Sequence, residues 1–196
     1  MDAQAQGAVG LQGARVAVIG NSGSGKSTLA RALSERLGVA HVELDALNWG
    51  PGWLDRSKEA PQTFIAALET ALAAPGWVTD GNYSRIALPR ILPKVTDVVW
   101  LDYSRPVLMT RVIRRSFRRA LSREELWPGT GNREVFRRWL DPGHPIRWTW
   151  DTFASAREGR SRLFAGKALA HARKHRFATP SQTRAWLATL DLPPGA

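Results

Sequence analysis

The segment GNSGSGKST, which runs from Gly20 to Thr28, decides the fold that we expect for this chain. It fits the pattern G-x-x-x-x-G-K-[ST], with glycines, a lysine and a serine at the fixed positions. Such a loop turns its backbone N–H groups inward and forms a nest for phosphate oxygens. The segment therefore predicts a nucleoside triphosphate site made by Gly20, Asn21, Ser22, Gly23, Ser24, Gly25, Lys26, Ser27 and Thr28.

The sequence on both sides of this loop supplies the setting that the pattern requires. Residues 14–19 form a short apolar run rich in β-branched residues, which is typical of a buried strand. Residues 27–37 place apolar side chains at helical spacing, and Gly38 fits the end of that helix. This context predicts that Lys26 reaches the β- and γ-phosphates and that the Ser27 hydroxyl binds Mg²⁺.

Length and composition are those of one globular domain spanning residues 1–196. The chain has 43% hydrophobic and 23% charged residues, and no apolar run approaches the roughly 20 residues that span a bilayer. Residues 1–12 lack the features of a secretory signal, and we expect a flexible tail there. The chain has no cysteine, which excludes disulfides and thiolate chemistry and fits a cytoplasmic protein.

The net charge of +11 is unevenly distributed. Residues 1–100 contain nine Lys/Arg and nine Asp/Glu, so the whole excess lies in residues 101–196. An excess of this kind indicates a polyanionic partner, which could be the phosphates of a nucleotide or the backbone of a nucleic acid. Solvated basic faces would also account for a share of it.

Strand and helix signals alternate along the rest of the chain. This alternation predicts a three-layer αβα fold with a five-stranded parallel sheet. The expected strands are 14–19, 39–45, 77–80, 97–101 and 176–179, and the expected helices are 27–37, 61–72, 106–121, 133–140, 147–174 and 180–190.

Two carboxylates are expected at the carboxyl ends of strands, where ligands bind in open α/β sheets. Asp45 is a candidate contact or general base for a phosphate acceptor, although it could instead cap the next turn. Asp80 is a candidate ligand for Mg²⁺ or its waters, with helix capping as the alternative. Arg85 lies one turn further on and could clamp an anionic acceptor.

Three other features complete the candidate site. Trp49 and Trp53 flank a turn in the loop 46–59, where they either pack on the core or hold a planar ligand. The expected helix 106–121 carries arginines at i, i+4 spacing, which repel one another unless an anion lies between them. Residues 122–147 are irregular and are expected to form a mobile, arginine-rich lid.

The segments GNSGSGKST, LDALNW, TDGNYSR and WLDYSRPVLMTRVIRR together resemble the P-loop kinases of the adenylate kinase group. Within that group, the chain is most similar to the small proteins named for DNA topology modulation. The resemblance covers about residues 14–190. Asp45 at a strand end is also similar to the corresponding residue of shikimate and gluconate kinases.

The resemblance implies roles for particular residues. Asp80 with Arg85 resembles the aspartate–arginine pair of the monophosphate site, although the arginine lies one place later than in adenylate kinases. Arg111 and Arg115 resemble the R-x-x-x-R pair that holds ATP and its transferring phosphate. The adenine is expected near Arg115, Thr179 and Pro180. The lid arginines that could reach the phosphates are Arg123, Arg133, Arg137, Arg138 and Arg147.

Together these residues predict a kinase that uses ATP and Mg²⁺ and phosphorylates a small molecule. Lys26, Asp80, Arg111 and Arg115 are its candidate catalytic residues, and the acceptor is nucleotide-like or sugar-acid-like. A nucleotide-regulated nucleic-acid-binding protein and a non-catalytic ATP-binding protein are the alternatives, and the first is disfavoured because no nucleic-acid-reading motif is present. We expect a monomer or weak dimer with no membrane partner.

Overall fold

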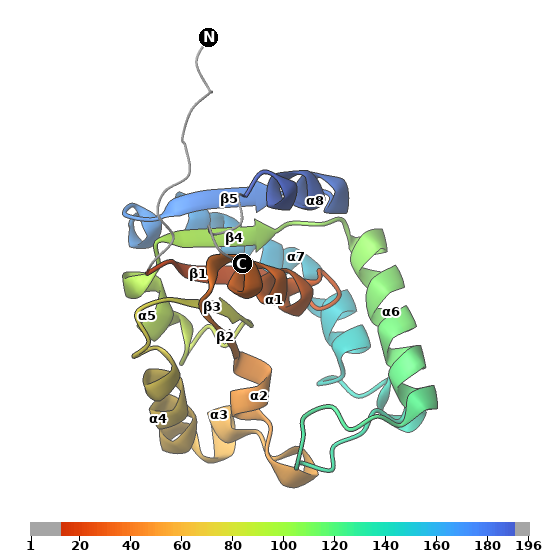
Figure 1. Ribbon diagram of the computed structural model, residues 1–196. Coiled ribbons are helices and arrows are strands. Elements are labelled where there is room, and N and C mark those ends of the chain that lie inside the picture. The colour runs from red at the N-terminus through yellow and green to blue at the C-terminus, as the bar shows by residue number, and fades with distance from the viewer. Residues whose placement is uncertain (1–12, 191–196) are drawn as a thin grey trace.

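A five-stranded parallel β-sheet lies at the centre of the molecule, with the strand order β2-β3-β1-β4-β5. The computed structural model describes residues 13–190. The strands are β1 Arg15–Gly20, β2 Ala40–Glu43, β3 Trp77–Asp80, β4 Asp97–Leu101 and β5 Arg173–Phe177. Figure 1 shows them side by side, from β5 at the top to β2 at the bottom. The expected α/β fold is confirmed.

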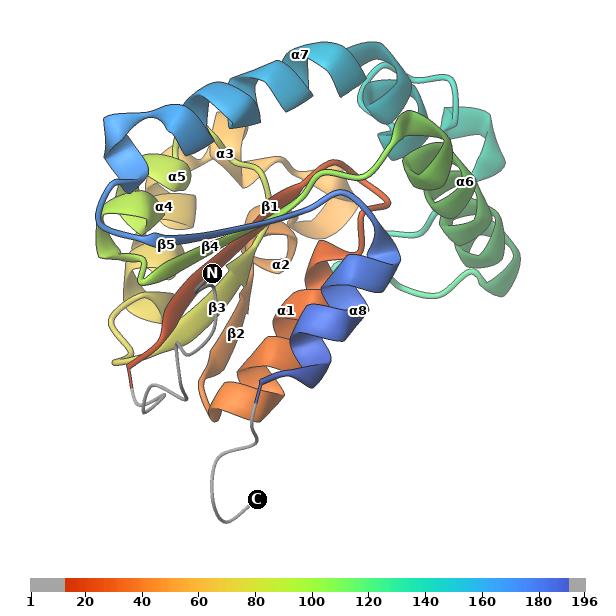
Figure 2. The ribbon, with the colours of Figure 1, turned by 90° about the horizontal axis from the view of Figure 1, so that it is seen from above.

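Helices connect the strands and cover both faces of the sheet. The α-helices are α1 Lys26–Leu37, α2 Leu44–Asn48, α3 Arg56–Glu59, α4 Pro61–Ala71, α5 Leu88–Ile91, α6 Arg105–Ser122, α7 Pro145–Ala165 and α8 Pro180–Ala188. Short 3-10 turns are η1 Pro51–Trp53, η2 Leu92–Lys94, η3 Phe136–Arg138 and η4 Lys167–Leu169. In Figure 2, α1 and α8 lie on one face of the sheet and α7 crosses the other.

The sheet separates two hydrophobic clusters. The cluster beneath α4 and α5 contains Trp77, Trp100 and Phe64, which are almost completely buried. The cluster on the other face contains Leu29 and Leu33 of α1, together with the side chains of β1 and β4 that point to this face. Because helices cover both faces, these central strands are apolar along nearly their whole length, as parallel sheets require. Among residues 13–190, no helix is long and apolar enough to cross a bilayer.

Strand β5 is attached to the sheet partly by ion pairs. Its Arg173 donates to both oxygens of Asp97 at 2.8 and 2.9 Å, and His175 contacts the same carboxylate at 3.0 Å. Burial raises the pKa of Asp97, but the hydrogen bonds from His175 and Arg173 outweigh burial and hold that pKa well below its ordinary value. The sequence predicts this strand at residues 176–179, but it runs from Arg173 to Phe177, because the polar residues 173–175 lack the apolar pattern of a strand and still pair with β4 through the backbone.

Three other expected boundaries were wrong. The second strand ends at Glu43, so Asp45 lies in the first turn of α2, and the loop expected at 46–59 contains α2, η1 and α3. The helix expected at 147–174 ends at Ala165, where Gly166 adopts an extended conformation. The helix expected at 133–140 is only the single turn η3, whose Phe136 packs against Phe117 of α6.

Gly23 tests the close contact between the glycine loop and α6. Its φ is +81°, and an added Cβ would lie 2.6 Å from the carbonyl oxygen of Leu108. We expect Gly23→Ala to lower the free energy of unfolding by about 2–4 kcal/mol, because backbone strain and a backbone clash add. Gly129 is the matched control, since its φ is +80° and nothing lies within 4 Å of the same position.

Gly129→Ala should therefore cost only about 1 kcal/mol, from the left-handed backbone alone. Urea unfolding of both variants measures the difference. Equal losses would contradict the proposed steric role of Gly23.

Candidate active site

The glycine loop between β1 and α1 holds Lys26 in a fixed position. Gly25 has a φ of +91° and caps α1, so that the first helical residue is Lys26 itself. The Lys26 ammonium donates a hydrogen bond to the carbonyl oxygen of Asn21 at 3.3 Å, which curls the side chain back over the loop. The α1 N-terminus and the Lys26 ammonium therefore face the same side of the loop, as a phosphate site requires.

The surroundings of Lys26 disfavour its charge unless an anion is bound. The pKa of Lys26 is lowered to about 8, mainly by burial and also by the guanidinium groups of Arg160 and Arg115. The carboxylates of Asp45 and Asp80 oppose this shift. Because burial exceeds the effect of both carboxylates, the ligand-free loop carries an incompletely compensated positive charge.

Two carboxylates, Asp80 at the end of β3 and Asp45 in α2, lie near this lysine, and Glu43 at the end of β2 lies beside them. Asp80 is buried and its Oδ1 lies 3.1 Å from Nε2 of His41. Asp45 accepts a hydrogen bond from the Tyr83 hydroxyl at 2.7 Å. Glu43, which pairs with Asp80 in the sheet, has a pKa raised by burial and by the neighbouring Asp80 and Asp45 charges.

The oxygen donors of this site fit a Mg²⁺ ion that binds together with a nucleotide. Ser27 lines the cleft, and Oδ2 of Asp80 accepts no hydrogen bond from a described residue. The mutual repulsion of Asp80 and Glu43 is what a divalent cation would relieve. Within residues 13–190, no group of three or more His, Asp or Glu side chains could hold a metal alone, so phosphate and water oxygens would complete the shell.

The two arginines of the R-x-x-x-R pair lie on α6 beside the glycine loop. Arg111 donates to the carbonyl oxygen of Ser24 at 3.4 Å and lies over the ring of Tyr103. Arg115 is half-buried, and its buried Nε has no hydrogen-bond partner in the described part of the chain. Burial lowers the pKa of Arg115 to about 10, and the adjacent Arg119 contributes to the shift, while the carboxylates of Glu134 and Asp45 oppose it. The Nε of Arg115 is therefore a donor that an anionic ligand could use.

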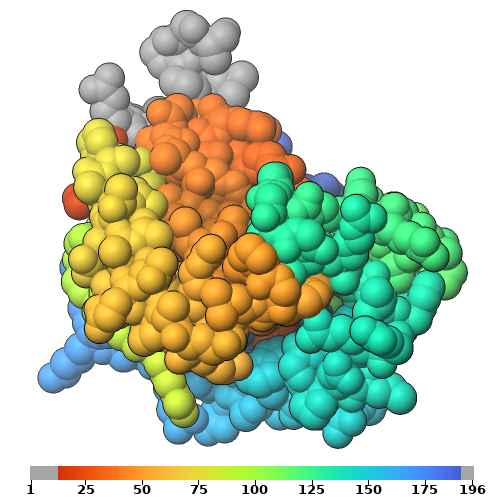
Figure 3. Space-filling model, turned by 90° about the horizontal axis from the view of Figure 1, so that it is seen from below, coloured from red at the N-terminus to blue at the C-terminus, as the bar shows by residue number. Residues whose placement is uncertain are grey.

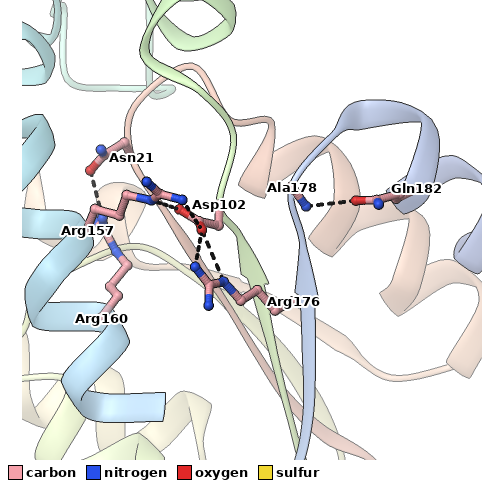
Figure 4. A network of polar contacts seen from close by, with 7 residues as sticks. All are labelled: Asn21, Asp102, Arg157, Arg160, Arg176, Ala178 and Gln182. Atoms are coloured by element: carbon pink, nitrogen blue, oxygen red, sulfur yellow. Dashed lines mark hydrogen bonds and ion pairs between the residues drawn. The ribbon is translucent and has the colours of Figure 1, made fainter. Parts of the chain in front are cut away.

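Asp102, which follows β4, has a structural role in a network that joins α7 to the loop (Figure 4). It accepts paired hydrogen bonds from Arg157 of α7 at 2.8 and 3.0 Å and from Arg176 of β5 at 3.0 and 2.6 Å. One turn along α7, Arg160 donates to Oδ1 of Asn21 at 2.8 Å. Helix α7 therefore contacts the phosphate-binding loop directly.

A cleft of about 1120 Å³ joins these groups. Its walls are the glycine loop from Ser22 onward, the carboxylates of Glu43 and Asp45, the arginines of α6 and parts of residues 122–147, which we call the lid segment, whereas Asp80 lies behind this wall. Asn132 of the lid segment accepts from the backbone N–H of Trp53 at 2.8 Å and donates to the carbonyl oxygen of Gly50 at 2.9 Å. Figure 3 shows this contact, where the orange residues around 50 meet the teal lid segment.

Tryptophans reinforce the same contact. The ring centroids of Trp49, Trp53 and Trp127 lie 5.7–6.1 Å apart, and the Trp127 indole N–H donates to Glu43 at 3.3 Å. Trp49 and Trp53 thus pack against the lid segment and also line the cleft. The packing role therefore involves the lid segment rather than the core, and a ligand contact by these rings stays a prediction.

Most of the residues predicted from the sequence lie together. Ser22 to Thr28, Asp45, Arg111, Arg115 and Pro180 line the cleft, as do Arg133 and Arg138 of the lid segment. The other three lid arginines, Arg123, Arg137 and Arg147, do not line it. Arg85 is exposed and is not part of the cleft wall, and the Thr179 hydroxyl is occupied by capping α8 through the Gln182 backbone N–H.

Several residues of the site are not evident from the sequence. Arg157 and Arg160 occur in a helix with no phosphate-binding pattern, although their i, i+3 spacing places them on one face. From the sequence, Glu43 looks like an ordinary polar residue of a strand. The feature that could have indicated its role is His41, two residues earlier, because the side chains of alternate strand residues point to the same face of the sheet.

Comparisons with known proteins support the fold. Neither a protein-family model nor a curated protein sequence matches the chain. The structure is similar to shikimate kinase from Acinetobacter baumannii in complex with shikimate, with a TM-score of 0.53 and 15% identity over 91% of each chain. Shikimate kinase from Bacteroides thetaiotaomicron gives a TM-score of 0.51 and 14% identity over 89% of this chain and 94% of that one.

A gluconokinase from Sinorhizobium meliloti 1021 gives a TM-score of 0.46 and 18% identity over 90% of this chain and 93% of that one. The two shikimate kinase structures show that this chain shares their α/β fold, with its parallel sheet and covering helices. At this level of identity, the similarity concerns the fold and identifies no acceptor.

The buried charge of Lys26 leads to a pH-dependent prediction. A lysine whose pKa falls from 10.5 when exposed to about 8 in the folded protein destabilises the fold while it is protonated in both states. We expect Lys26→Met to raise the free energy of unfolding of the ligand-free protein by about 2 kcal/mol at pH 7. The gain should shrink as the pH rises from about 8 towards 10, where the folded wild-type lysine is neutral.

Chemical unfolding of both proteins across this pH range measures the difference. Lys58→Met is the control, because this lysine is 80% exposed. A stability gain for Lys26→Met that is the same at every pH would contradict the assignment.

The Asp102 network predicts that losing the Asp102 carboxylate lowers the free energy of unfolding more than losing the Asp151 carboxylate. Asp102→Ala leaves Arg157 and Arg176 without their shared carboxylate, which is itself 4% exposed. We expect a loss of about 2 kcal/mol in the free energy of unfolding, reduced by solvent because both guanidinium groups are half exposed. Asp151→Ala, which breaks an exposed i, i+4 pair with Arg147, should cost less than about 0.5 kcal/mol. Equal losses in urea unfolding would contradict this ranking.

Proposed function

We propose that this protein transfers the γ-phosphate of Mg-ATP to a hydroxyl group of a small molecule. The observation that carries the proposal is that Lys26, Arg111 and Arg115 line one cleft with Asp45. The three cations suit a triphosphate, and a carboxylate suits a hydroxyl acceptor. The fold of the small P-loop kinases and the motif resemblance to adenylate kinase relatives support the same reading.

In the proposed reaction, the acceptor oxygen forms a bond to the γ-phosphorus while the bond from that phosphorus to the β–γ bridging oxygen breaks. ADP leaves with the electron pair of the broken bond. Lys26, Arg111 and Arg115 neutralise the charge that develops on the transferred group and on ADP. A Mg²⁺ ion held by Ser27 and, directly or through water, by Asp80 would supply further charge neutralisation.

Asp45 is the proposed general base. Its Oδ1 accepts from Tyr83, and Oδ2 accepts no hydrogen bond from a described residue, so that oxygen is free for the acceptor hydroxyl. The proton of that hydroxyl passes to Asp45 and then to water. Contacts of the lid segment with Trp53 and Gly50 cover this part of the cleft and limit the access of water to the triphosphate.

The test is ADP formation from Mg-ATP in the presence of nucleoside monophosphates, sugar acids and other hydroxyl compounds. We expect turnover that requires an acceptor and that falls by about 100-fold or more in Arg115→Ala. Arg114→Ala is the matched control, because Arg114 is an exposed neighbour on α6 outside the cleft wall. It should retain turnover within about threefold.

The outcome that would overturn the proposal is equally specific. If no acceptor stimulates ADP formation and the protein binds DNA with an affinity that falls steeply with salt, the basic half of the chain serves nucleic acid instead. ATP binding with neither activity would identify a non-catalytic nucleotide-binding protein.

A further inference from the structure

We infer that the acceptor is a polyhydroxyl compound without negative charge, such as a sugar alcohol or an amino sugar, rather than an acid or a phosphate ester. The inference rests on the proposed kinase function and concerns the chemistry of the cleft wall opposite the glycine loop. That wall combines carboxylates with tryptophans, and the cation expected there from the sequence is elsewhere.

Carboxylates dominate the polar groups of the acceptor side. Glu43, Asp45 and Asp55 all line the cleft. Asp55 stays ionised because hydrogen bonds from Lys58, Ser57 and Asn48 outweigh burial and keep its pKa below the ordinary value. Oε2 of Glu43 and Oδ2 of Asp45 accept no hydrogen bond from a described residue. Ionised carboxylates only accept hydrogen bonds, so these oxygens suit ligand hydroxyl or ammonium donors.

Two of the cations near this wall have partners, and a third lies outside it. Lys58 contacts Asp55 at 2.8 Å, and the guanidinium of Arg138 lies over Trp53 and 3.3 Å from Asp141. Arg85, the anion clamp that the sequence suggests, is exposed and outside the cleft wall. Arg133, which is also exposed, is the remaining cation of the lid segment on the cleft.

The tryptophans supply the apolar part of the recognition. Trp49, Trp53 and Trp127 line the same side of the cleft as the carboxylates. Large aromatic faces pack well against the C–H groups of a polyol and also attract cationic groups, whereas the negative potential of the ring face does not attract an anion. A carboxylate or phosphate on the acceptor would also be repelled by Glu43, Asp45 and Asp55. A polyol accommodates both kinds of neighbour.

A charge series on one carbon skeleton tests this inference. Gluconate, sorbitol and glucamine share hydroxyls on carbons 2–6 and differ at carbon 1, where the charge is −1, 0 or +1. Quinate and inositol provide a second, cyclic comparison. We expect kcat/KM for ADP formation to be about tenfold or more higher for the uncharged and cationic members than for the acids, because like charges a few ångströms apart repel. The products are ADP and a phosphate monoester of the polyol.

Two variants separate recognition from folding. Glu43→Gln removes one carboxylate charge from the cleft wall and should reduce the preference for sorbitol over gluconate by about threefold or more. Glu69→Gln, on α4 and 59% exposed, makes the same chemical change outside the cleft and should leave the preference unchanged. Thermal unfolding of both variants verifies that they are folded.

Each result has one interpretation. Turnover that is fastest with an acid, a nucleoside monophosphate or another phosphate ester overturns the inference and leaves the kinase function intact. An unchanged preference in Glu43→Gln also overturns it. ATP binding without turnover of any charged or uncharged acceptor overturns the kinase function itself, and the inference with it.

Discussion

Positive charge that the neighbouring carboxylates compensate only in part is the constraint on which this structure depends. Lys26, Arg115 and Arg160 converge on the glycine loop, and burial lowers the pKa of each of them. The nearest carboxylates reduce this cost but do not remove it. Such an arrangement is stable only because the surrounding sheet and helices contribute enough elsewhere, and it reserves the strongest attraction in the molecule for an incoming polyphosphate.

The sheet and the glycine loop were predictable because their signals are local. The strand Trp77–Asp80 has the bounds expected from its apolar run. The glycine loop follows β1 directly, as its sequence pattern predicts. The order of the strands follows from parallel connections through helices. For these elements, side chains and backbone prefer the same structure, so sequence and fold agree.

The rest of the site depends on contacts between distant residues. Arg157 and Arg160 find their partners 55 and 139 positions away, and no local pattern marks that pairing. The sequence predicts Asp45 at the end of a strand, whereas in the structure it lies in α2. The reason is that Leu44, which extends the apolar run, is buried as the first residue of that helix. The spacing between Asp80 and Arg85 suggests an arginine that binds an anionic acceptor, but the backbone after β3 places Arg85 outside the cleft wall.

The contact between Asn132 and the turn from Gly50 to Trp53 joins two parts of the cleft wall that lie far apart in the sequence. The Asn132 side chain binds the backbone of that turn at both of its ends, so the position of the lid segment depends on the turn. A different lid segment could therefore not be grafted onto this scaffold alone, since the turn must change with it. In an engineered chain, the two segments would have to be exchanged as one unit.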